Sequence, residues 1–305
     1  MPVEPMPMPV ASLKDEASFT AAEIDRFFSN LLAKPGDSRD PLYEAMCHAA
    51  IDGGKRMRPL LVRAAGRLFD VPEERLLRAG AAIEAIHVYS LIHDDLPCMD
   101  DDDLRRGKPT LHKAYDEAIA VLAGDSLHDL AFVVLADEAT HPEPQVRVDL
   151  IAELAKAAGP VGMAGGQVMD LEAEKMGELG IEDITRLQQL KTGALIEYCV
   201  EAACILARKD ADARTPYRGY ARNVGLAFQI ADDLLDVGGD EEKAGKRLHK
   251  DEDAGKATFV SLLGEERARE QANILVEQAI EHLHDHGEEA DLMRAIARYA
   301  VERDR

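Results

Sequence analysis

The sequence predicts an all-α protein built around one large helical domain. Long segments rich in Ala, Leu, Glu and Arg carry hydrophobic residues at helical spacing, and alternating strand patterns are hard to find. The chain has 305 residues, which suits one large domain or two. Trp is absent and aromatic residues make up only 5%, so we expect a mostly aliphatic core. We predict a disordered tail over residues 1–12 and one domain over residues 13–305.

The helices are predicted from hydrophobic spacing and from the residues at their boundaries. A first amphipathic helix is expected over residues 18–33, before Pro35-Gly36, and Pro59 suits the first turn of another helix. The glycine-rich segment 159–170 lacks a nucleotide-loop spacing and is interpreted as a helix bend that makes room for a substrate. The remaining helices are expected over residues 41–50, 60–69, 75–91, 115–138, 146–158, 183–207 and, as the last ones, within 261–300.

The composition limits the classes of partner and compartment. The formal net charge of −22 argues against non-specific binding to nucleic acid or to an anionic membrane, because both require a cationic face. We expect no apolar run long enough to span a bilayer, and the proline-interrupted start does not resemble a signal peptide. The four cysteines lack a zinc spacing, which favours free thiols in a reducing cytoplasm.

Two acidic clusters each end an apolar, helix-compatible segment. Six carboxylates lie between Asp94 and Asp103, and Pro97 within them should end or distort the helix. Asp232 and Asp236 are four residues apart, on adjacent turns of one helix face. Carboxylates so placed repel one another unless a cation joins them, and oxygen ligands without Cys or paired His favour magnesium. We therefore expect the two clusters to form two walls of a cavity that holds metals and a diphosphate.

Basic residues near these clusters suggest anion binding. Lys55 and Arg58 follow Gly53-Gly54 and precede a helix, which is a plausible anion site, although an ordinary solvated basic turn remains open. His87 lies seven residues before Asp94, on the same helix face, where a buried core histidine is the alternative interpretation.

These motifs resemble those of short-chain polyprenyl diphosphate synthases of the bacterial farnesyl diphosphate synthase type. The segment Asp94-Asp95-Leu96-Pro97-Cys98-Met99-Asp100 is similar to the first aspartate-rich motif of that family in its long form. Asp232-Asp233-Leu234-Leu235-Asp236 is similar to the second, and the resemblance runs from about residue 45 to residue 264.

The resemblance implies the isoprenoid synthase fold, a helical barrel around a deep central cavity, usually in a homodimer. It implies magnesium-dependent, head-to-tail condensation of isopentenyl diphosphate with dimethylallyl or geranyl diphosphate to farnesyl diphosphate, with three magnesium ions. The implied metal ligands are Asp94, Asp95, Asp100, Asp232 and Asp236. The implied ligands of isopentenyl diphosphate are Lys55, Arg58, His87 and Arg106. The implied residues on the allylic side are Arg105, Lys191, Thr192, Gln229, Lys246 and Lys256. Charge stabilisation on the leaving diphosphate is assigned to Arg105, Lys191 and Lys246, together with the metal ligands.

Product length is expected to depend on Tyr89 and Ser90, the fifth and fourth residues before Asp94. In the family, a bulky residue at the fifth position acts as a floor that stops elongation. Helix geometry alone places Tyr89 about 140° from the face of Asp94, so an ordinary core tyrosine stays open.

The alternatives are a geranylgeranyl diphosphate synthase, a class I terpene cyclase, a non-catalytic prenyltransferase subunit and a calcium-binding acidic protein. The cyclase has a different second motif, the subunit would have lost acidic ligands, and the last needs an absent D-x-D-x-D-G loop.

Overall fold

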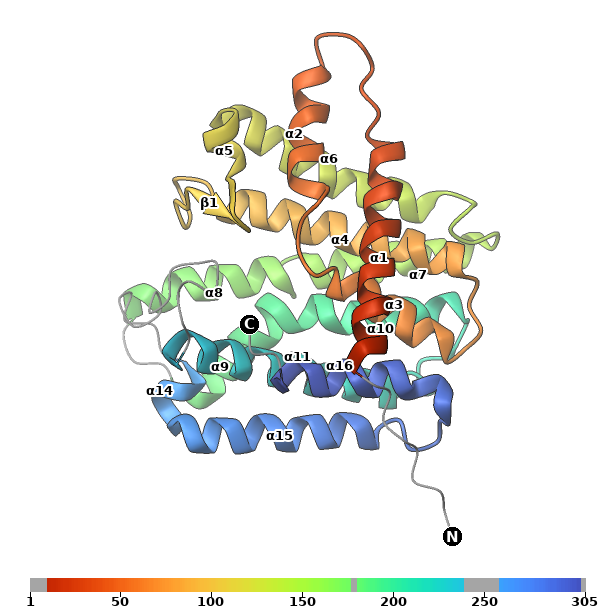
Figure 1. Ribbon diagram of the computed structural model, residues 1–305, viewed down its shortest axis with the longest axis vertical. Coiled ribbons are helices and arrows are strands. Elements are labelled where there is room, and N and C mark those ends of the chain that lie inside the picture. The colour runs from red at the N-terminus through yellow and green to blue at the C-terminus, as the bar shows by residue number, and fades with distance from the viewer. Residues whose placement is uncertain (1–9, 177–179, 239–257, 303–305) are drawn as a thin grey trace. The chain divides into compact units, whose positions relative to one another are not determined.

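The computed structural model of the protein describes residues 10–176, 180–238 and 258–302. Within these ranges the chain is helical apart from one short hairpin (Figure 1), which confirms the all-α prediction. The long helices are α1 (Val10–Leu31), α2 (Asp40–Ala50), α3 (Met57–Arg67), α4 (Glu73–Asp94), α6 (Glu117–Ala136), α7 (Pro144–Ala158), α8 (Met163–Met176), α10 (Ala194–Leu206), α11 (Thr215–Gly238), α15 (Glu265–Glu281) and α16 (Asp291–Glu302). The shorter elements are β1 (Leu104–Arg105), β2 (Lys108–Pro109), α5 (Leu111–Ala114), α9 (Ile181–Gln188), η1 (Gln189–Gly193), α14 (Phe259–Leu263) and η2 (Glu288–Ala290).

The chain forms two compact units. The first comprises residues 14–63 and 72–151, and the second comprises residues 1–13, 64–71 and 152–305. The first helix begins at Val10, eight residues before the expected start, because the stretch preceding Ser18 consists mainly of good helix formers. The single domain over 13–305 stays a prediction, and so does the tail over 1–12, of which residues 1–9 lie outside the described ranges.

In the first unit, α4 packs along α6, and α2 packs against both (Figure 1). Every residue of α4 from Ala79 to Ile86 is buried, so the middle of α4 is part of the core. A Cβ atom on Gly124 would lie 2.2 Å from Nε2 of His93, so this glycine permits the close approach of α6 to α4.

Helix α6 corrects one expectation from the sequence. Its 20 residues are long and apolar enough to cross a membrane by length and composition, so the statement that no run reaches that length was wrong. This signal is weak because core helices of soluble proteins pass the same test. The N-terminus of α6 is capped by Asp116, whose side chain accepts a hydrogen bond from Ile119 N at 2.8 Å.

In the second unit, α11 packs against α10, α15 and α16 (Figure 1). Tyr220 of α11 is completely buried, and its hydroxyl donates to the carbonyl of Met293 on α16 at 2.7 Å. The single helix expected over residues 183–207 is instead divided by η1, a π-helical turn. Such turns occur often at functional sites, so the division draws attention to Lys191 and Thr192 within it.

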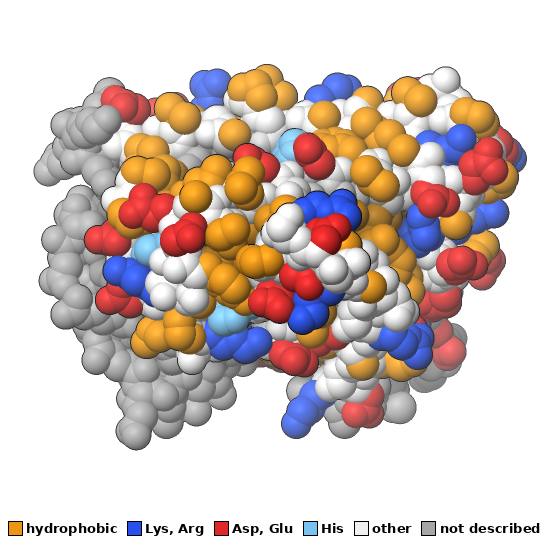
Figure 2. Space-filling model, turned by 90° about the horizontal axis from the view of Figure 1, so that it is seen from above, with side chains coloured by type: hydrophobic (Ala, Val, Ile, Leu, Met, Phe, Trp, Pro, Cys, Tyr) orange, Lys and Arg blue, Asp and Glu red, His pale blue; other side chains and the backbone are white. Residues whose placement is uncertain are grey.

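Acidic and basic side chains are interspersed on the surface despite the large negative net charge. Figure 2 shows both kinds lying among hydrophobic side chains on the face seen from above. Basic groups are therefore available to an anionic ligand, as expected from their local clustering in the sequence.

Candidate active site

The first acidic cluster begins where α4 ends. Asp94 is the last residue of the helix and Asp95 is its C-cap. The backbone N–H of Asp100 donates to the carbonyl of Asp94 at 2.8 Å, so the loop turns back on the helix end. This confirms that the helix ends before Pro97, and it places the backbone of Asp100 beside that of Asp94.

Asp95 is buried and paired with Arg105. The Nε–H group of Arg105 donates to Oδ1 of Asp95 at 2.9 Å, and its Nη2 also pairs with Asp95 and, at 3.3 Å, with Asp102. Burial raises the pKa of Asp95 above its ordinary value, although the guanidinium opposes that shift. Arg105 therefore neutralises the innermost carboxylate of the cluster in this structure.

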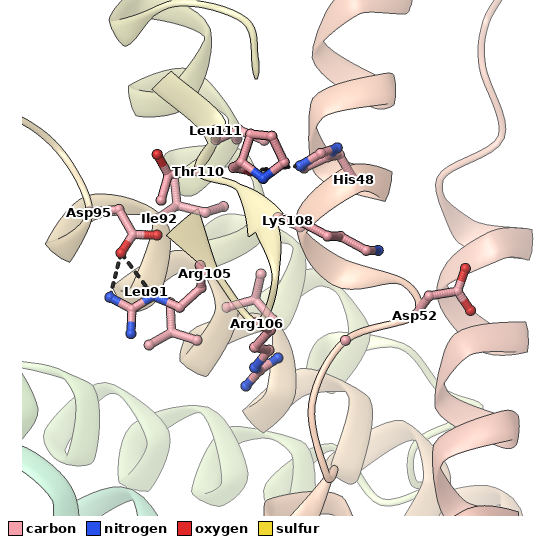
Figure 3. Close-up of a pocket in the computed structure, with 14 residues that line it drawn as sticks. His48, Asp52, Leu91, Ile92, Asp95, Arg105, Arg106, Lys108, Thr110 and Leu111 are labelled. Atoms are coloured by element: carbon pink, nitrogen blue, oxygen red, sulfur yellow. Dashed lines mark hydrogen bonds and ion pairs between the residues drawn. The ribbon is translucent and has the colours of Figure 1, made fainter. Parts of the chain in front are cut away.

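The hairpin of β1 and β2 aims two consecutive arginines in different directions. Its two-residue loop, Arg106-Gly107, has φ values of 55° and 77°, as in a type I′ turn. Figure 3 shows Arg105 turned toward Asp95 while Arg106 extends away from it. The guanidinium of Arg106 instead lies 3.4 Å from Nε2 of His87.

The C-terminal end of α2 holds this hairpin. Nε2 of His48 donates to the carbonyl of Pro109 at 3.0 Å, and Nζ of Lys108 donates to the carbonyl of Ile51 at 3.3 Å. The hairpin, α2 and α4 line a small pocket that is partly open to solvent (Figure 3). Neither His48 nor Lys108 was singled out from the sequence, because both donate to backbone carbonyls of distant segments, which leave no mark in the sequence.

Three of the residues predicted for isopentenyl diphosphate, Arg58, His87 and Arg106, lie near one another in the first unit. A Cβ on Gly54, whose φ is 75°, would lie 2.4 Å from Cζ of Arg106, so only glycine admits this guanidinium. Burial, and then the positive charges of Arg58 and Arg106, lower the pKa of His87 well below its ordinary value. His87 is therefore neutral near pH 7. Lys55, the remaining residue of this predicted set, is exposed at the surface.

The second acidic cluster lies on α11. Asp233 and Asp236 are buried, and Asp232 is half-buried. Oδ2 of Asp233 accepts a hydrogen bond from Phe259 N at 2.8 Å, at the start of α14. Asp233 thus serves as a helix cap, whereas Asp232 and Asp236 remain the predicted ligands. Gln229 is half-buried one turn before Asp232.

Lys191 lies in η1 and is held by α8. Its Nζ pairs with Oδ2 of Asp170 at 2.5 Å. A Cβ on Gly166 would lie 2.2 Å from the backbone N of Lys191, so this glycine allows direct backbone contact between α8 and η1. Thr192 is half-buried beside it. Lys246 and Lys256 lie outside the described residues.

The donor chemistry of both clusters fits a hard divalent cation. Among the described residues, no group of three or more His, Cys, Asp or Glu side chains is arranged to hold a metal ion. Each cluster nevertheless presents carboxylate oxygens, which are the ligands that magnesium prefers. The predicted ligands therefore stay a prediction that the type of donor supports.

Tyr89 lies at the contact between α4 and α6. Its ring packs edge-to-face on His128 of α6 at 5.1 Å and on His93 at 5.6 Å between centroids. His128 in turn contacts Phe132. The hydroxyl of Ser90 donates to the carbonyl of His87 at 2.8 Å. His128 was missed from the sequence, although its four-residue spacing from Phe132 places both on one helix face.

Comparison with known proteins connects these features to one family. The sequence matches the polyprenyl synthetase family over residues 39–299. It is 42% identical to the farnesyl diphosphate synthase of Escherichia coli over 93% of this chain and 96% of that protein. It is 41% identical to a chloroplastic geranylgeranyl pyrophosphate synthase of Catharanthus roseus, over 87% of this chain and 75% of that one. The crystal structure of an FPP/GFPP synthase from Zymomonas mobilis is 55% identical, with a TM-score of 0.88 over 96% of this chain and 100% of that chain.

Proposed function

Because the chain belongs to the polyprenyl synthetase family, we propose that it condenses isopentenyl diphosphate with an allylic diphosphate in a magnesium-dependent reaction. We propose farnesyl diphosphate as the main product. The all-α isoprenoid synthase fold and the transferase class agree with this proposal. The observation that carries it is the pair of complete aspartate motifs, each on the end portion of a helix, in a chain that matches this family nearly end to end.

The allylic diphosphate is the substrate whose carbon–oxygen bond breaks. Asp94, Asp95, Asp100, Asp232 and Asp236 would hold the magnesium ions, which supply neutralisation of negative charge on the leaving diphosphate. Arg105 and Lys191, with Lys246, add positive charge to the same oxygens. In this structure Arg105 is paired with Asp95 and Lys191 with Asp170. These carboxylates fix the positions of the two basic side chains, which would also contact the substrate.

Isopentenyl diphosphate is the nucleophile. Lys55, Arg58 and Arg106 would bind its diphosphate through charge-assisted hydrogen bonds, and neutral His87 adds a donor without a further charge. The double bond attacks the allylic cation, and a proton then leaves for the released diphosphate. Exclusion of water protects the cation from hydrolysis.

Product length is the least constrained part of the proposal. Geranylgeranyl synthases share a similar identity with this chain, so that product is the main alternative. Tyr89 favours farnesyl diphosphate, because a bulky ring at the α4–α6 contact can close a cavity that runs along α4. We further propose a cytoplasmic location and a homodimer, and sedimentation of the purified protein would test the dimer.

Incubation with magnesium, dimethylallyl diphosphate and isopentenyl diphosphate tests the function. We expect prenyl diphosphates that become fifteen-carbon alcohols after dephosphorylation. A terpene cyclase would release hydrocarbon or cyclic alcohol instead, and a non-catalytic subunit or calcium-binding protein would give no product.

Two substitutions test the role of the motifs. Asp94→Ala or Asp232→Ala should lower turnover by about 100-fold or more, because each removes charge stabilisation at the leaving group. Asp103→Ala is the matched control, since Asp103 is exposed and pairs with Lys113 at 2.9 Å on the surface. Folded Asp94 or Asp232 variants with normal turnover would refute the assignment.

A further inference from the structure

Arg56 is a buried arginine in the middle of an otherwise accessible basic segment. Only 2% of it is exposed, whereas its neighbour Lys55 is exposed and Arg58 is half-buried. Its φ of 49° lies in the left-handed region, which residues with a Cβ rarely adopt. The backbone here therefore adopts an unfavourable conformation that turns the Arg56 side chain into the protein.

The guanidinium of Arg56 connects three helices. Nη1 donates to Oε1 of Glu84 on α4 at 2.7 Å, and Nη2 donates to Oδ1 of Asp25 on α1 at 2.7 Å. Nη2 also donates to the carbonyl of Ala50, the last residue of α2, at 2.5 Å. Glu84 is itself only 1% exposed, so both members of this ion pair are withdrawn from water.

Stability alone does not account for this arrangement. Removing two charges from water is costly, and replacing a buried ion pair with apolar residues of similar volume is often neutral or stabilising. Burial would lower the pKa of Arg56, but Glu84 and Asp25 raise it above the ordinary value, so the group stays charged. A charged, strained and fully buried residue indicates a requirement for an exact position, as is common beside functional sites.

The elements joined to Arg56 are those that present the diphosphate ligands. Gly54, two residues earlier, contacts the guanidinium of Arg106 through the space that its missing side chain leaves. Arg58, two residues later, lies in the first turn of α3. Glu84 lies one turn before His87 on α4. Burial lowers the pKa of Arg106, and the Glu84 carboxylate opposes that shift.

We propose that Arg56 and Glu84 are positioning residues for the isopentenyl diphosphate site. The pair fixes the segment 53–58 against α4, so that Lys55 and Arg58 face the ligand while Arg106 and His87 are held beside them. Glu84 also offsets the repulsion among these cations when no diphosphate is bound. The inference rests on the proposed function and predicts a defect confined to one of the two substrates.

The test combines binding without turnover and steady-state kinetics. Arg56→Lys keeps the charge but loses the planar fork that reaches three partners, and Glu84→Gln keeps the shape but loses the countercharge. Both should raise the Kd for isopentenyl diphosphate, measured calorimetrically without allylic substrate, and its KM by about 10-fold to 100-fold. The KM for the allylic diphosphate should change by less than about threefold, a limit well below that misplacement effect.

A double variant and a control separate positioning from stability. Arg56→Met with Glu84→Met removes both buried charges together, so it should fold while retaining the binding defect. Arg63→Lys is the control, because Arg63 makes a similar tie from α3 to Glu16 and Glu73 and should leave both KM values unchanged. Its thermal stability then shows the effect of weakening a more exposed set of ion pairs that also joins α3 to α1 and α4.

The outcomes are distinguishable. A wild-type chain that condenses both substrates, with folded variants that bind isopentenyl diphosphate equally well, would overturn the inference alone. An equal rise in both KM values would overturn it also, because a general structural role predicts that result. A wild-type chain that neither binds nor condenses isopentenyl diphosphate would refute the proposed function, and the inference with it.

Discussion

Substituting Gly166 with alanine should both destabilise the second unit and impair use of the allylic substrate. Its added Cβ would lie 2.2 Å from the backbone N of Lys191, 2.5 Å from its Cα and 2.8 Å from the carbonyl carbon of Leu190. Backbone atoms cannot rotate away as a side chain can. Helix α8 and η1 must therefore separate locally by about 1 Å to relieve the overpacking.

The size of the effect follows from this displacement. Overpacking of this kind costs about 1–3 kcal/mol. At about 2–4 °C per kcal/mol, the melting temperature should fall by roughly 2–12 °C. Because Lys191 moves with its backbone, its contact with Asp170 and its reach to the diphosphate change together. A shift near 1 Å can lower kcat/KM for the allylic substrate by about 100-fold.

Calorimetry and steady-state kinetics with the allylic diphosphate varied would measure both effects. Gly193→Ala in the same π-helical turn is the matched control for stability, because its Cβ would meet nothing closer than 3.6 Å. That change should stabilise by up to about 1 kcal/mol, since alanine is the better helix former. A Gly166→Ala variant with unchanged melting temperature and kinetics would show that α8 and η1 do not pack as described.

Three further predictions address product length, substrate assignment and pH. Tyr89→Ala should open the α4–α6 contact and allow at least one more five-carbon addition, which chromatography of dephosphorylated products would reveal; an unchanged distribution would remove Tyr89 as the floor. Arg58→Ala should mainly raise the KM for isopentenyl diphosphate and Lys246→Ala that for the allylic substrate, and the reverse pattern would mean that the two sites are exchanged. Burial alone would raise the pKa of Glu201, yet hydrogen bonds from Arg218 and Arg214 bring this pKa below its ordinary value of 4.5. The ionised Glu201 therefore stabilises the fold above pH 4.5, and this contribution is lost as the pH falls below 4.5. Glu201→Gln should therefore flatten the acid limb of stability against pH and cost about 1–3 kcal/mol at pH 7; an unchanged acid limb in denaturation curves would contradict this.

Much of the fold could be predicted because hydrophobic spacing and proline act locally. Pro97 correctly indicated the end of α4, and the apolar spacing indicated a helix there. Other features depend on contacts between distant residues. The spacing of Asp232, Asp233 and Asp236 did not show that Asp233 accepts a hydrogen bond from Phe259 N at the start of α14, 26 residues later. The glycines of 159–170 correctly indicated a bend, since the chain turns at residues 159–162 between α7 and α8, but the contact of Gly166 within α8 with the backbone of Lys191 could not be predicted.

The sites were easier to predict than their supports. Aspartates and arginines in a motif can be recognised by residue type alone, so the candidate ligands could be proposed from the sequence. The groups that hold them, such as His48 and Lys108 beneath the hairpin, bond to backbone carbonyls of other segments. Such bonds leave no pattern in a single sequence, because any residue supplies a carbonyl.

The left-handed conformation of Arg106 bears on how this chain would respond to artificial selection. Its φ of 55° favours Asn or Gly, and the following Gly107 already meets the demand of the turn. Arg106→Asn or Arg106→Gly should thus make the hairpin easier to form while removing a guanidinium from the proposed isopentenyl diphosphate site. A library screened for heat resistance alone would be expected to enrich such replacements, and one screened for catalysis would discard them. At position 106, selection for thermal stability and selection for turnover would therefore favour different residues.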